Sequence, residues 1–176
     1  MKRFPISVVV PIALFCALGL FTKSAISSEV YESEKYGIKA TVPEGWKVIN
    51  MDDEEEEGAF QPVFEMKRKQ ALDGKKPSAK LTANKVKIDD IESFGRDFVS
   101  NIQKQGFRII RQQVSTIGGK PAFEATGEMS AGPITISLTW IFMAGEKYLF
   151  MLTLSDVDSA AVGDEINQLL ESIEYN

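Results

Sequence analysis

The side chains best suited to chemistry in this chain are carboxylates, because it contains no histidine and only one cysteine, Cys16. Carboxylate oxygens bind Ca²⁺ and Mn²⁺, and six acids in a row could chelate such an ion. The run lacks the alternating acids and central glycine of a calcium-binding loop, so we expect no resident metal and no cofactor. A solvated loop or a docking patch for a basic protein partner is the better interpretation. The residues of this predicted patch are Asp52, Asp53, Glu54, Glu55, Glu56 and Glu57.

Catalysis has few candidate residues. Without histidine, and with Cys16 inside an apolar N-terminal stretch, the mature chain can build neither a Ser-His nor a Cys-His site, nor a zinc site of imidazole and thiolate ligands. Glu124 and Glu128 share one side of a predicted strand, but four residues of strand separate them by about 13 Å, too far for a shared site. We therefore predict that the protein is not an enzyme. A carboxylate-based enzyme or a small-ligand carrier stays an alternative, since a cleft can form between helix and sheet.

The first 27 residues have the order of a secretory signal peptide, with a basic start at 1–3, an apolar stretch at 4–21 and a small, polar run from 22 onward. Ala25 and Ser27 have small-x-small spacing, which predicts cleavage near Ser27. The apolar stretch is close to the roughly 20 residues of a membrane span, so an uncleaved N-terminal anchor is the alternative. A lipid-modified cysteine normally follows a small residue. Cys16 follows Phe15, so we interpret it as an apolar residue of the leader.

The charge balance is acidic, with 20 Lys and Arg against 25 Asp and Glu and a net charge of −5. Cleavage at the predicted site removes three basic residues and no acid, which leaves a net charge of −8. An acidic mature chain argues against binding to nucleic acid or to anionic lipid, so membrane contact is expected only through an uncleaved leader. The remaining length, about 149 residues, suits one domain with a real core.

Alternating apolar residues and turn residues predict mostly strands after a flexible lead-in at residues 28–35. Trp140 continues the apolar side of a long strand at 134–142 and should lie in the core. Trp46 directly follows a turn at 43–45, and we include it in the candidate docking surface. The basic run at 67–69 should be solvated. The expected extended runs are 38–42, 46–48, 60–66, 79–88, 107–116, 121–129, 134–142 and 148–154.

Two helices are expected. Asp89 and Glu92 fit a capping-box start for the first, and Gly106 its end. The apolar stripe of this helix comprises Ile91, Phe94, Phe98 and Ile102. The second carries a stripe of Val162, Ile166, Leu169, Leu170 and Ile173. Two helices and about six antiparallel strands predict an α+β fold.

Three segments resemble PsbP-like domains. The strand that runs into Pro43-Glu44-Gly45-Trp46, the Gly-Gly-x-Pro hairpin at 117–122, and the closing hairpin and helix all match that pattern. The similarity covers residues 36–175, and we assign the PsbP-like domain to 36–176. The resemblance implies an α/β/α sandwich with a central antiparallel sheet and a non-catalytic role through protein contacts. It also connects the chain with bacterial periplasmic DcrB-like proteins and a eukaryotic Ran-binding regulator. Metal roles that depend on histidine cannot transfer to this chain.

The expected function is that of a secreted or periplasmic PsbP/DcrB-like protein that binds an unidentified protein partner, as an accessory or stress-related envelope factor. A short leader without a long Ser- and Arg-rich transit segment favours a bacterial envelope. An accessory subunit of a photosynthetic complex is the alternative that the resemblance leaves open.

Overall fold

The computed structural model describes residues 29–53, 58–72, 74–157 and 160–176. The leader predicted at 1–27 lies outside these residues. Within the described part, no helix is both long and apolar enough to cross a membrane. The elements in chain order are β1 (Val30–Ser33), β2 (Ile38–Thr41), β3 (Trp46–Asn50), β4 (Gln61–Arg68), β5 (Ser78–Asn84), α1 (Ile91–Lys104), β6 (Arg108–Ile117), β7 (Lys120–Ala131), β8 (Ile134–Ala144), β9 (Leu149–Ser155), α2 (Ala160–Ser172) and β10 (Glu174–Tyr175).

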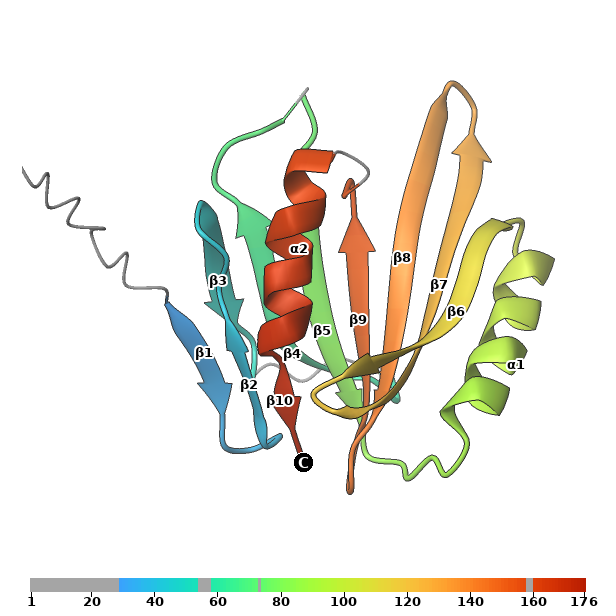
Figure 1. Ribbon diagram of the computed structural model, residues 1–176. Coiled ribbons are helices and arrows are strands. Elements are labelled where there is room, and N and C mark those ends of the chain that lie inside the picture. The colour runs from blue at the N-terminus through green and yellow to red at the C-terminus, as the bar shows by residue number, and fades with distance from the viewer. Residues whose placement is uncertain (1–28, 54–57, 73, 158–159) are drawn as a thin grey trace, which may run out of the picture.

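The strands form two antiparallel sheets (Figure 1). The main sheet has seven strands in the order β3-β4-β5-β9-β8-β7-β6, and a small sheet has the order β1-β2-β10. The predicted α+β fold with a central antiparallel sheet is therefore confirmed. The central sheet has seven strands where about six were expected, and the short strands β1 and β10, which none of the expected extended runs included, belong to the small sheet.

The two helices cover opposite faces of the main sheet, as the α/β/α prediction requires. Successive residues of a strand point to opposite faces, and Ile141 and Phe142 on β8 show the consequence. Phe142 packs with α1, where the Phe94 and Phe98 rings lie 5.3 and 4.7 Å from it in edge-to-face geometry. Ile141 belongs to the other cluster, which also contains the apolar stripe of α2 and the small sheet.

The N-cap of helix α1 lies one residue later than the predicted cap, Asp89. Asp90 is the N-cap, and its carboxylate accepts a hydrogen bond from the Ser93 amide at 2.9 Å. Gly95 brings the helix close to β7, since a Cβ at this position would lie 2.1 Å from the Phe123 ring. The predicted stop is confirmed: Gly106 has a φ of +98°, a conformation that favours glycine.

The flexible lead-in predicted at 28–35 is wrong for residues 30–33, which form β1 and pair along their full length with β2. Tyr31 anchors this strand. Its ring is buried against Phe64, with centroids 4.8 Å apart, and its hydroxyl donates to the Val63 carbonyl at 2.9 Å. Because these contacts join distant segments, the polar local sequence did not reveal the strand.

Candidate functional site

The acidic run begins directly after β3, where the structure describes Asp52 and Asp53; residues 54–57 lie outside the described part. Asp52 is partly used by the fold. Its Oδ1 accepts from the Tyr31 hydroxyl at 2.8 Å, and its main-chain oxygen accepts from Lys35 Nζ at 2.5 Å. Burial and this bond to Asp52 hold the pKa of Tyr31 well above its ordinary value. Asp53 is exposed.

Metal chelation by the run gains no support from the described carboxylates. Within residues 29–53, 58–72, 74–157 and 160–176, no three acidic or sulfur side chains come together as a metal site. Docking by residues 54–57 stays a prediction, and chelation by them stays the alternative that was not favoured.

The inclusion of Trp46 in the docking surface is wrong. Trp46 is only 1% exposed, and its Nε1 donates to Glu165 Oε2 of α2 at 2.7 Å. The turn before β3, where Gly45 has a φ of +80°, directs the indole under α2. A ring that fills the core in this way cannot meet a partner.

The prediction that the basic run at 67–69 is solvated is wrong for Arg68, which binds a carboxylate of α2. Arg68 Nε lies 3.1 Å from Glu165 Oε2, and Arg68 Nη2 lies 3.1 Å from Glu165 Oε1. Burial alone would raise the pKa of Glu165, but the hydrogen bonds from Arg68 and Trp46 and the charge of Arg68 outweigh burial and hold it below its ordinary value. Glu165 therefore accepts from two elements of the main sheet as a carboxylate.

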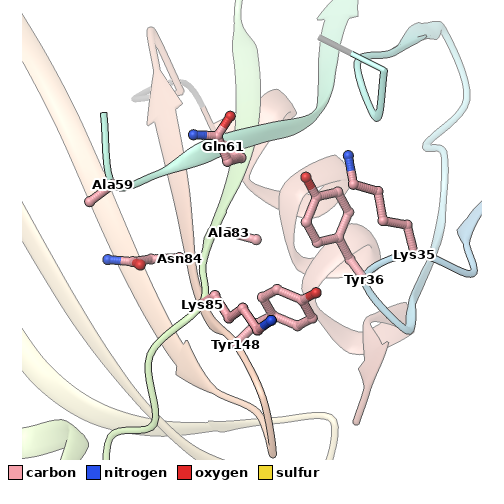
Figure 2. Close-up of a pocket in the computed structure, with 8 residues that line it drawn as sticks. All are labelled: Lys35, Tyr36, Ala59, Gln61, Ala83, Asn84, Lys85 and Tyr148. Atoms are coloured by element: carbon pink, nitrogen blue, oxygen red, sulfur yellow. The ribbon is translucent and has the colours of Figure 1, made fainter. Parts of the chain in front are cut away.

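The candidate binding site is a hollow of about 420 Å³ where four chain turns and strand ends meet (Figure 2). The β1–β2 turn, the start of β4, the end of β5 and the β8–β9 turn all contribute to it. Its lining residues are Lys35, Tyr36, Ala59, Gln61, Ala83, Asn84, Lys85 and Tyr148.

Two of the lining residues are tyrosines that pack against each other. The Tyr36 and Tyr148 rings lie 5.3 Å apart at an interplanar angle of 73°, an edge-to-face arrangement. Tyr36 is buried and Tyr148 is half-buried. Both tyrosines, with Lys35, also line a neighbouring hollow of about 230 Å³. The pair is thus shared by two concave surfaces.

Sequence reasoning did not find this hollow. In the sequence, Tyr36 stands out only as the first residue of the PsbP-like similarity. The other lining residues come from segments with no common motif. Asn84, Lys85 and Tyr148 come together because β5 pairs with β9, with Asn84 opposite Leu149, and Gln61 lies opposite Ala83 in the β4–β5 pair. These pairings are properties of the folded sheet, so no local sequence signal could have grouped these residues.

The fold is similar to solved structures of low sequence identity. Cyanobacterial PsbP (CyanoP) from Synechocystis has a TM-score of 0.60 at 14% identity, over 90% of this chain and 99% of that one. LpqN, described as involved in cell envelope biogenesis of Mycobacterium tuberculosis, has a TM-score of 0.54 at 19% identity over 86% of both chains. A Bacteroides thetaiotaomicron structure has a TM-score of 0.54 at 12% identity, over 85% of this chain and 48% of that one.

These similarities define the fold as PsbP-like, as the sequence resemblance predicted. No family model matches the sequence. No curated protein matches it either. The names given to CyanoP and LpqN do not denote enzymes. At these identities the comparison establishes the architecture, and function has to be argued from the surface of this chain.

Proposed function

We propose that this protein is a non-catalytic accessory factor of the bacterial cell envelope that works through protein contacts. Export by the predicted signal peptide at 1–27 and the absence of histidine support this role. LpqN, which has a similar fold, is described as involved in cell envelope biogenesis. CyanoP has the same fold, so an accessory role in a photosynthetic complex is the alternative.

The observation that carries the proposal is an exposed apolar surface on the β7–β8 hairpin. This hairpin extends beyond the neighbouring strands and beyond α1 (Figure 1). Ile134 is 62% exposed and Ile136 is 37% exposed. Strand alternation places both on the face that carries Trp140, together with Leu138 and with Met129, which pairs with Ile136. We call these four residues, Met129, Ile134, Ile136 and Leu138, the hairpin face.

The opposite side of the same hairpin is polar. Thr126 and Thr139 share a hydrogen bond of 2.9 Å there, and Glu128 pairs with Arg108 at 2.6 Å. One apolar side on a projecting hairpin is typical of an interaction surface. Each isoleucine that a partner fully covers would contribute roughly 1.5–3 kcal/mol before other costs.

The test is cross-linking in intact cells of the native host, followed by capture of the protein from the envelope fraction. We expect the wild-type chain to recover a specific protein partner. Ile136→Glu should abolish recovery, because it places a charge in the apolar contact. Thr135→Glu is the matched control. Thr135 is the neighbour of Ile136 on β8, and its side chain points to the polar side of the hairpin, so this variant should retain the partner.

Three results would each contradict a different part of the proposal. A protein found only in the cytoplasmic fraction would refute export. Equal recovery by the wild type and Ile136→Glu would refute the hairpin face as the contact surface, and repeated failure of the wild type to recover any partner would refute the role itself.

A further inference from the structure

The hollow at Tyr36 and Tyr148 presents two lysine–tyrosine pairs from separate parts of the chain (Figure 2). Lys35 and Tyr36 are consecutive in the β1–β2 turn, and Lys35 Nζ lies 5.0 Å from the Tyr36 ring centroid. The second pair follows from the sheet register. Asn84 ends β5 opposite Leu149, the first residue of β9, so Lys85 and Tyr148 lie directly beyond the last paired residues.

The lining chemistry favours an anionic ligand. Lysine ammonium groups only donate hydrogen bonds, and the phenol and amide groups can donate as well. None of the eight lining residues is acidic. Two of the eight lining residues, Lys35 and Lys85, are cationic.

One ammonium group is held in place before any ligand binds. Lys35 Nζ donates to the main-chain oxygen of Asp52, while the Asp52 carboxylate is bound by Tyr31. The interaction with Tyr36 and the nearby negative charges of Asp52 and Asp53 also hold the pKa of Lys35 above its ordinary value. A charged group fixed at the rim loses little conformational freedom when a ligand binds.

The remaining groups suit a sugar ring. Asn84 and Gln61 carry amides, which can both donate to and accept from hydroxyl groups. Gln61 Nε2 donates to the Gly58 carbonyl at 3.0 Å, and this contact orients its side chain. Tyr148 is half-buried and offers part of its ring as an apolar surface. The volume of about 420 Å³ lies in the lower range of small-molecule pockets and suits one ring.

We propose that this hollow binds a monosaccharide that carries a carboxylate or a phosphate. The two lysines bind the acidic group, Asn84 and Gln61 bind ring hydroxyls, and Tyr148 packs against the ring. This inference goes beyond the proposed function, because it assigns a small-molecule ligand to a surface other than the hairpin face.

The test is isothermal titration calorimetry of the exported protein, purified from its host, with four probes: glucuronate, glucose 6-phosphate, glucose and inorganic phosphate. We expect one of the two acidic sugars to bind with a Kd on the order of 1 mM or tighter. Glucose and inorganic phosphate should each bind at least about tenfold more weakly. The acidic sugar that binds more tightly identifies the acidic group as a carboxylate or a phosphate.

Variants locate the binding in the hollow. Lys85→Gln should raise the Kd of the acidic sugar about tenfold, because it removes one ammonium group from an exposed position. Lys87→Gln is the matched control. Lys87 is also exposed, does not line the hollow and pairs with Asp89 at 3.4 Å, so affinity should stay unchanged.

Several outcomes would overturn the inference. These are no heat with any probe, glucose or inorganic phosphate binding as tightly as the tighter acidic sugar, or equal affinity in Lys85→Gln and the wild type. None of these measurements involves Ile136 or a protein partner, so a failure here is distinguishable from a failure of the proposed function.

Discussion

The indole nitrogen of Trp46 lies 2.7 Å from a carboxylate oxygen of Glu165, a residue 119 positions away in the sequence. This bond joins β3 to α2. Arg68 on β4 binds the same carboxylate, and Trp46 and Arg68 are register partners in the sheet. One carboxylate thus connects two neighbouring strands with the helix that covers them. We expect this arrangement to stabilise the fold and to determine how α2 sits.

Glu165→Gln should lower the free energy of unfolding by on the order of 1 kcal/mol, because a neutral amide replaces a charged acceptor of hydrogen bonds. Urea unfolding followed by tryptophan fluorescence measures this change. Glu171→Gln, at an exposed position of the same helix, is the control and should leave the midpoint unchanged. An equal effect of both substitutions would show that the contact with Trp46 and Arg68 contributes nothing specific.

The stability difference between the wild type and Glu165→Gln should depend on pH. The folded-state pKa of Glu165 is lowered, so its contribution is fully present above the unfolded-state pKa, about 4.3. It is lost as the pH falls through the lower folded-state pKa. Urea unfolding at pH 7 and at successive values below pH 4 should show the difference shrinking. A difference that stays constant across this range would contradict the assignment.

The two interior helix glycines should respond in opposite ways to alanine. Gly95→Ala places a Cβ 2.1 Å from the Phe123 ring, and the overpacking should cost about 1–3 kcal/mol after the gain in helix propensity. Gly163→Ala in α2 meets no atom within 4 Å and should stabilise the protein by about 0.5–1 kcal/mol. Thermal and urea unfolding measure both. If Gly95→Ala is as stable as the wild type, the close packing of α1 on β7 is incorrect.

Two buried tyrosines provide a second matched comparison. Tyr31→Phe removes a hydroxyl that donates to Asp52 and to the Val63 carbonyl, and it should destabilise the protein by about 1–2 kcal/mol. The hydroxyl of Tyr175 is buried without a hydrogen-bond partner among the described residues, and burial raises the pKa of Tyr175 to about 12. Tyr175→Phe should therefore be neutral or stabilising. Urea unfolding midpoints that fall equally in both variants would contradict this contrast.

Much of the fold was predictable from local patterns. The apolar alternation of residues 134–142 and 148–154 predicted β8 and β9, and the spacing of Ile91, Phe94, Phe98 and Ile102 predicted α1. These patterns are readable because a strand or helix that lies on a core repeats its apolar side chains with its own period. The core position of Trp140, 7% exposed, followed from the same pattern.

The candidate site was less predictable than the fold. The acidic run was visible as a charge pattern, but the contact of Trp46 with Glu165 of α2 and the pairing of the Tyr31 strand with β2 were not. The hollow requires the β5–β9 register before Lys85 and Tyr148 become neighbours. Each of these features joins segments that are distant in the sequence.

By itself, the sequence determined the periods of the main elements, the acidic charge and the lack of histidine, because these depend only on residue types and their spacing. Only the tertiary structure decided which side chains meet: Trp46 with Glu165, Tyr36 with Tyr148, and an uncovered hairpin face around Ile136. The physical reason is that pairing and packing between distant segments are set by the burial of the whole core, which no short stretch of the chain specifies alone.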